Sequence, residues 1–218
     1  MIEAVIFDMD GLLIDSEPFW REAHGKALKR HGHTLTIDDH RTTMGRRTDE
    51  VARHWHKHFS LTISPEELEQ EVVAHLIEQV SINGQQLPGV QNIIGLLQEH
   101  GLPMAVASSS APEIIDVVMK KLDLARHMKL VYSTKYEKFG KPHPGVFLTT
   151  AKKLGVAPKN CLVFEDSITG VKAAKAAGMK CIAVPSQEDR GRPEIKEADL
   201  VVNSLKDVTW EDINNLWK

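Results

Sequence analysis

The chain has 218 residues, of which 26% are charged, with 27 Lys and Arg against 30 Asp and Glu. A net charge of −3 is too small to indicate binding to nucleic acid or to an anionic membrane, so we expect small-molecule partners. No apolar stretch approaches the roughly 20 residues of a membrane span, and no signal peptide precedes the first apolar run, so we expect a soluble cytoplasmic protein.

The first predicted element is a strand that ends in acidic residues. Residues 2–7 have the length and composition of a buried strand; Asp8 follows it, Asp10 comes two residues later, and Gly11 permits a turn. Ligands of open α/β sheets bind at the carboxyl ends of the strands. Two carboxylates this close repel each other, which suggests that a cation lies between them.

The next segment, residues 17–83, shows helical periodicity and no convincing strand. Pro18 and Pro65 are typical of the first turns of two of its helices. A helical insertion after the first strand is typical of a cap over an active site. We therefore expect two domains, a core of residues 1–16 and 84–218 and a helical cap of residues 17–83.

Beyond residue 84, strands and helices alternate. Expected helices cover residues 90–100, 112–122, 144–154 and 168–177, and expected strands cover residues 104–107, 130–132, 162–164, 181–184 and 200–202. This alternation predicts an α/β fold with a doubly wound parallel sheet. Cys161 and Cys181 lie in apolar runs, so we expect buried thiols rather than a disulfide.

Three more polar groups stand at strand ends or in loops before helices. They are Ser108-Ser109-Ser110, Lys141 among prolines, and the acidic pair Glu165-Asp166. Each alone is typical of a helix cap or a surface turn. In a parallel sheet, however, all of them would meet near Asp8, and their combination favours a catalytic site.

These groups, together with Phe7-Asp8-Met9-Asp10-Gly11, resemble the four motifs of the haloacid dehalogenase superfamily, in its branch of sugar-phosphate phosphatases and β-phosphoglucomutases. The resemblance covers the whole α/β part of the chain. It implies that Asp8 is the nucleophile and forms an aspartyl-phosphate, while Asp10 acts as general acid and then as base. It also implies Mg²⁺ bound by the Asp8 side chain, the Asp10 backbone carbonyl and Asp166, with Mn²⁺ or Co²⁺ able to substitute.

The same resemblance gives roles to the other groups. Ser108 would bind the phosphoryl oxygens, the Ser109 backbone N–H would be a further donor, and Lys141 would neutralise the charge of Asp8 and of the phosphate. Glu165 would support the metal site without binding the ion, because three oxygens already come from other residues. The sequence thus predicts a magnesium-dependent phosphatase.

Three other functions fit the sequence less well. A β-phosphoglucomutase carries a histidine twelve residues after its nucleophile, where this chain has Trp20, and an indole cannot transfer a proton as imidazole does. A carbon–halogen hydrolase needs no metal and would not require Asp10. A binding module that had lost the chemistry would lack one of the motif groups, and none is missing.

Substrate choice is expected to depend on the cap. Arg46 and Arg47 lie in a cap loop, and Arg47 is the better candidate for a substrate contact because similar loops of this branch carry an arginine that faces the substrate. We expect hexose phosphates such as 2-deoxyglucose 6-phosphate as substrates, and a monomer. His54 and His58 share a helix face but lack further ligands, which favours a solvated face over a metal site.

Overall fold

A computed structural model describes residues 1–187 and 189–218. Within them, six strands form one parallel sheet in the order β3-β2-β1-β4-β5-β6. The strands are β1 Ala4–Phe7, β2 Met104–Ser108, β3 Leu130–Ser133, β4 Cys161–Glu165, β5 Lys180–Ala183 and β6 Leu200–Val201. The central strand β1 carries only apolar residues, as a strand covered on both faces requires.

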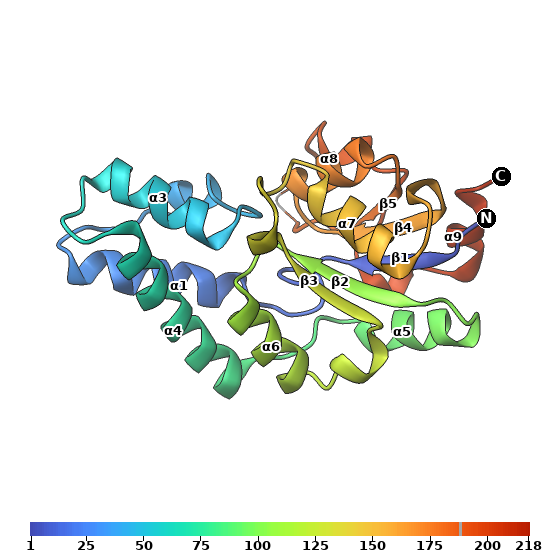
Figure 1. Cartoon of the computed structure of the whole chain (residues 1–218), viewed down its shortest axis with the longest axis horizontal. Coiled ribbons are helices and arrows are strands. Elements are labelled where there is room, and N and C mark those ends of the chain that lie inside the picture. Colours follow the sequence, from blue (N-terminus) through green and yellow to red (C-terminus); the bar gives the residue numbers. More distant parts are fainter. Residues whose placement is uncertain (188) are drawn as a thin grey trace.

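Helices cover both faces of this sheet (Figure 1). Alternate residues of β1 face opposite ways: Val5 and Phe7 join one apolar cluster, and Ala4 and Ile6 join the other. The first cluster takes in α5 Val90–Glu99, α6 Pro112–Lys121 and α9 Trp210–Asn215, and the second takes in α7 Gly145–Leu154 and α8 Ile168–Ala176. The predicted α/β fold with a doubly wound sheet is therefore confirmed.

The remaining helices lie together at one end of the molecule (Figure 1). They are α1 Glu17–Arg30, α2 Ile37–Arg41, α3 Thr48–Phe59 and α4 Pro65–Asn83. Their connections to the sheet run side by side, since the Asp15 N–H donates to the Gln85 carbonyl and the Leu87 N–H to the Leu13 carbonyl. We propose that this paired connection is the hinge of a cap, residues 17–83, on a core of residues 1–16 and 84–218.

Two of the α-helices, α2 and α9, were not predicted as separate elements. Both begin with a capping box, in which a threonine and an aspartate three residues later bond each other's backbone N–H groups; the pairs are Thr36 with Asp39 and Thr209 with Asp212. The spacing of threonine and aspartate in the sequence could have indicated the start of both helices. Single 3₁₀ turns complete the structure: η1 Ala125–His127, η2 Thr134–Tyr136, η3 Pro158–Asn160, η4 Ile195–Glu197 and η5 Leu205–Asp207.

Candidate active site

The carboxyl ends of β1, β2 and β4 bring most of the predicted site residues together. Asp8 follows β1, Ser108 ends β2, and Glu165 ends β4 with Asp166 next to it. Lys141 reaches the same place from the loop before α7. The parallel register predicts this meeting, because the three strand ends lie at one edge of the sheet.

Lys141 is the centre of a buried ionic cluster. Its side chain is 1% exposed, and its ammonium group donates to the Asp8 carboxylate, to Glu165 Oε1 at 2.6 Å and to the Ala107 carbonyl at 3.1 Å. Glu165 itself is fully buried. Two carboxyl groups thus share one cation in a buried site.

Burial shifts the pKa values of the carboxyl groups in this site. Burial raises the pKa of Asp8 to about 7, although the adjacent Lys141 lowers it. Burial also raises the pKa of Asp166, with further contributions from Glu165 and Asp8. The pKa of Lys141 is raised above its ordinary value, because the attraction of Asp8 and Glu165 outweighs the effect of its burial. A second cation would relieve the repulsion among the carboxylates.

The carboxylates fit a divalent metal ion. Asp8, Glu165 and Asp166 each offer an oxygen, and these oxygens lie within 4.8 Å of one another. Hard oxygen donors suit Mg²⁺. Glu165 is already engaged, since Oε1 accepts from Lys141 and Oε2 accepts from the Ser167 hydroxyl at 3.0 Å and from two backbone N–H groups. We therefore expect Asp8 and Asp166 to hold the ion and Glu165 to fix its surroundings.

Gly11 permits Asp166 to reach this position. Its φ of +71° lies in the left-handed region, and a Cβ atom there would overlap the Asp166 carboxylate. The turn after Asp10 thus requires glycine for two reasons, backbone conformation and space.

Asp10 accepts hydrogen bonds from several side chains, and none of these contacts is predicted by the sequence. Its Oδ1 accepts from the Ser16 hydroxyl at 2.6 Å and from Trp20 Nε1 at 2.9 Å, and its Oδ2 accepts from the Ser110 hydroxyl at 2.6 Å. The Ser108 hydroxyl is farther, at 3.4 Å. Trp20 thus does more than replace a histidine: it holds the side chain that is expected to move the proton.

The two serines predicted to bind phosphate are placed differently. Ser108 is fully buried, and its hydroxyl accepts from the Ser110 N–H at 3.0 Å. Ser109 lines the cavity described below, and its hydroxyl donates to the Gly45 carbonyl of the helical region at 3.0 Å. Their contacts with phosphate stay predictions.

A cavity of about 60 Å³ is lined both by these residues and by the helical region. Its sheet side is formed by residues that include Asp8, Asp10, Ser109, Ser110, Lys141 and Asp166. Its other side is formed by residues that include Glu17, Trp20, His24, His40, Arg46 and Val51. The space holds a few water molecules or a phosphate-sized group, because one water needs on the order of 10–15 Å³.

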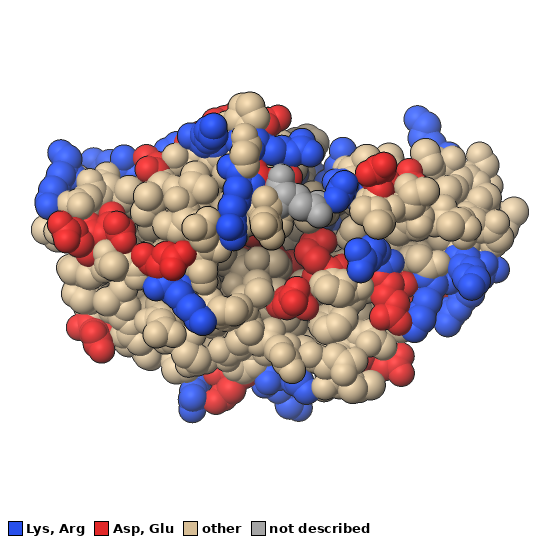
Figure 2. All heavy atoms as spheres, turned by 180° about the vertical axis from the view of Figure 1, so that it is seen from behind, with Lys and Arg blue, Asp and Glu red and all other residues tan. Residues whose placement is uncertain are grey.

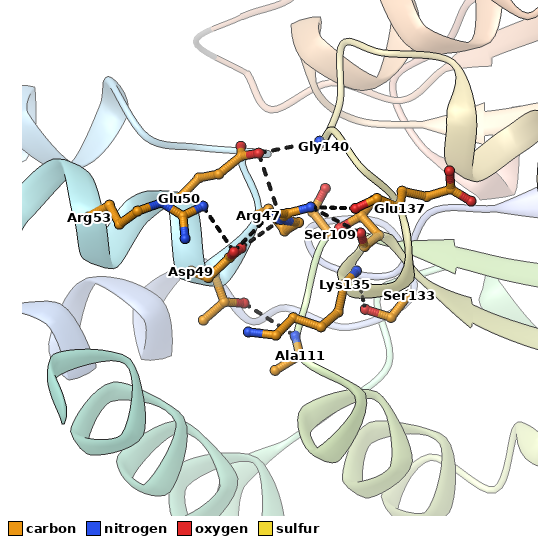
Figure 3. A network of polar contacts seen from close by, with 12 residues as sticks. Arg47, Asp49, Glu50, Arg53, Ser109, Ala111, Ser133, Lys135, Glu137 and Gly140 are labelled. Atoms are coloured by element: carbon orange, nitrogen blue, oxygen red, sulfur yellow. Dashed lines mark hydrogen bonds and ion pairs between the residues drawn. The ribbon is translucent and has the colours of Figure 1, made fainter. Parts of the chain in front are cut away.

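Arg47, the predicted substrate contact, is not among the residues that line this cavity. Its guanidinium forms two hydrogen bonds to Asp49, at 2.6 and 2.8 Å, and donates to the Glu137 carbonyl at 2.8 Å (Figure 3). Glu50 also accepts a hydrogen bond from the backbone N–H of Gly140, which is the residue before Lys141. Arg47 therefore ties α3 to the loop that carries Lys141.

Arg46 takes the position expected of Arg47. It lines the cavity and an adjacent groove of about 360 Å³, and its side chain is exposed. Acidic and basic side chains are interspersed over the face shown in Figure 2. Two neighbouring arginines thus have different surroundings, and sequence alone could not tell them apart.

Comparison with known proteins gives a consistent result. The family model of haloacid dehalogenase-like hydrolases matches residues 2–178. Hexitol phosphatase B of Escherichia coli (strain K12) is 36% identical over 97% of this chain and 96% of its own length. A phosphorylated carbohydrates phosphatase of Thermotoga maritima is 31% identical over 95% of this chain and 100% of its own length. A crystal structure of β-phosphoglucomutase from Clostridium difficile has a TM-score of 0.88, with 24% identity, and covers 100% of this chain and 97% of that one.

A separate observation concerns membranes. Among the described residues, no helix has the length and apolar character needed to cross a bilayer.

Proposed function

The chain belongs to the haloacid dehalogenase-like hydrolase family and is a phosphoric monoester hydrolase, and we propose that it hydrolyses hexose and hexitol phosphates through an aspartyl-phosphate on Asp8. One observation carries the proposal: the buried Asp8 carboxylate contacts Lys141, lies beside Asp166 and faces the cavity. Phosphate monoesters hydrolyse extremely slowly without a catalyst, so this concentration of charged groups suits the task. The names of the two relatives support a phosphorylated carbohydrate as substrate.

The proposed reaction has two displacements. An Asp8 oxygen attacks phosphorus, the bond from phosphorus to the sugar oxygen breaks, and Asp10 gives that oxygen a proton. Asp10 then takes a proton from water, the water oxygen attacks phosphorus, and the bond to Asp8 breaks, which releases inorganic phosphate. Lys141 neutralises negative charge on Asp8 throughout. A Mg²⁺ held by Asp8, Asp166 and the Asp10 carbonyl would supply positive charge to the phosphoryl oxygens.

Water must reach the aspartyl-phosphate for hydrolysis, whereas a mutase must return the phosphoryl group to a sugar. Trp20 favours hydrolysis, because its indole N–H can only donate to Asp10 and cannot carry a proton from a bound sugar. Since a hexose phosphate is much larger than the cavity, we propose that the cap opens to admit substrate and closes before the chemical steps.

Phosphate release from a panel of monoesters tests the proposal. The panel holds glucose 6-phosphate, 2-deoxyglucose 6-phosphate, sorbitol 6-phosphate and β-glucose 1-phosphate, each assayed with Mg²⁺ and with EDTA. We expect free phosphate from several of them and none with EDTA. Conversion of β-glucose 1-phosphate into glucose 6-phosphate with little free phosphate would establish a mutase instead, and activity that survives EDTA would contradict the metal site.

The two neighbouring arginines give a matched pair of variants. Arg46→Met removes an exposed charge beside the cavity, so we expect KM to rise about threefold to tenfold with no change in thermal unfolding. Arg47→Met leaves the buried Asp49 with a single cationic partner, Arg53, and we expect the free energy of unfolding to fall by about 2–4 kcal/mol. Steady-state kinetics and chemical denaturation measure the two effects. The reverse pattern would return the substrate contact to Arg47.

A further inference from the structure

The segment that leads to Lys141 is held by the helical region. Residues 134–140 connect the end of β3 to Lys141, and the start of α3 lies against their backbone (Figure 3). Arg47 Nη1 donates to the Glu137 carbonyl at 2.8 Å and to the Thr134 carbonyl at 3.4 Å. One guanidinium group thus spans two backbone carbonyls of the segment.

Gly140, the last residue of this segment, is in direct contact with α3. Its backbone N–H donates to Glu50 Oε1 at 3.3 Å. A Cβ atom at position 140 would lie 3.0 Å from Glu50 Oε2 and 3.2 Å from Arg47 Cβ, so the helix packs closely on this backbone. Because Gly140 is covalently bonded to Lys141, the position of α3 bears directly on the backbone of that lysine.

The contacts of α3 with this segment do not serve the cavity itself. Neither Arg47 nor Glu50 is among the residues that line it. The charge of Arg47 is already paired with Asp49, which leaves Nη1 for the two carbonyls. Lys135 adds a contact with another helix, since its ammonium group donates to Glu69 of α4 at 3.0 Å. Two helices of the proposed cap therefore hold the segment that precedes Lys141.

We propose that Arg47 and Glu50 are positioning residues for Lys141, because the start of α3 holds residues 134–140 so that the lysine reaches Asp8. Displacement of a functional group by about 1 Å can cost about 100-fold in rate, so the support of its backbone matters. The proposal rests on the proposed function, in which Lys141 neutralises negative charge on Asp8. The placement of the lysine can nevertheless be measured without a substrate.

Reductive methylation with formaldehyde and dimethylamine–borane, followed by mass spectrometry, reports the accessibility of Lys141. The wild-type side chain is 1% exposed and should react slowly. Glu50→Met removes the acceptor of the Gly140 N–H, so we expect methylation of Lys141 to become about tenfold faster. Glu50→Gln keeps an oxygen that can accept this hydrogen bond and should recover most of the protection. An unchanged rate in Glu50→Met would overturn the proposal, whether or not the protein is a phosphatase.

Steady-state kinetics tests whether α3 acts through the lysine. For the best substrate of the panel above, we expect Glu50→Met to lower kcat about 5- to 10-fold with little change in KM. In a Lys141→Met background the same substitution should cost less than about twofold, because the group that it positions is absent. Gly140→Ala, which crowds α3 from the side of the loop, should also lower kcat.

Glu66→Met is the matched control. Glu66 is an exposed acidic residue in the first turn of α4, as Glu50 is an acidic residue in the first turn of α3. Among the described residues it forms no hydrogen bond or ion pair with residues 134–140, so its variant should keep the wild-type methylation rate and kcat. All variants are compared below the onset of their thermal unfolding.

The outcomes separate this proposal from the one on which it rests. If wild type releases no phosphate from any ester of the panel, the proposed function fails, and the methylation rates alone decide whether α3 places Lys141. If Glu50→Met raises KM and leaves kcat unchanged, Glu50 acts on substrate binding and the proposal is overturned. An equal loss of kcat with and without Lys141 would also overturn it, since Glu50 would then act independently of the lysine.

Discussion

Replacement of Asp8 by asparagine is expected to lower kcat by at least about 10⁴-fold while the protein stays folded. The amide is nearly the same size as the carboxylate but is a far weaker nucleophile, so no aspartyl-phosphate can form. Folding should survive, because the ionised form of Asp8 is disfavoured by burial and Lys141 keeps Glu165 as a partner. Phosphate release measures the loss, and thermal unfolding checks the fold.

Asp15→Asn is the matched control for this variant. Asp15 is an exposed acidic residue in the same loop and is not among the residues lining the cavity, so its variant should keep wild-type kinetics. Rapid acid quenching followed by mass spectrometry should show a phosphorylated peptide containing residue 8 in wild type and none in Asp8→Asn. An Asp8→Asn enzyme with near-normal turnover would refute the nucleophile assignment.

Lys141→Met is expected to reduce both activity and stability. Its ammonium group lies among the carboxylates, so we expect kcat to fall by about 10³-fold when that charge is lost. Glu165 is fully buried and would lose its cationic partner, so the free energy of unfolding should fall by about 3–5 kcal/mol. Steady-state kinetics should be measured at a temperature at which circular dichroism shows that the variant is folded. The loss of activity is then separated from the loss of stability.

The control for Lys141→Met comes from the same loop. Lys138 is exposed and lies over the Phe139 ring, so Lys138→Met should change neither quantity appreciably. Retention of more than a tenth of wild-type kcat in Lys141→Met would show that the lysine does not act on the reacting phosphate. Unchanged stability would show that the buried carboxylates take up protons and remain neutral when Lys141 is absent.

The site residues on the sheet could be predicted without knowing the order of the strands. Any parallel arrangement brings the carboxyl ends of its strands to one edge, so Asp8, Ser108 and Glu165 had to lie at one side. Runs of three to six mostly apolar residues set the strand positions, and the observed bounds differ from the predicted ones by at most two residues.

The helical side of the site was not predictable in the same way. Helical periodicity shows which residues are buried but not which cavity a buried polar residue meets, so His24 and His40 gave no signal. Arg46 and Arg47 are adjacent residues of the same type at the start of α3, so the sequence does not show which of them lines the cavity. The hydrogen bonds from Ser16 and Ser110 to Asp10 depend on how the start of α1 and the end of β2 pack against the loop after β1. The spacing of these residues in the sequence does not show that packing.

The neighbouring arginines have a further consequence for how ionic strength acts on this enzyme. At physiological salt the field of an exposed charge is screened beyond roughly 8 Å, whereas a pair shielded from solvent is screened much less. Arg46 is exposed, so added salt should weaken the capture of anionic substrates and raise KM. The side chains of Arg47 and Asp49 are each 12% exposed, so the contact of α3 with the Lys141 loop should persist. Salt would then slow the arrival of substrate without separating α3 from the loop that holds Lys141 beside Asp8.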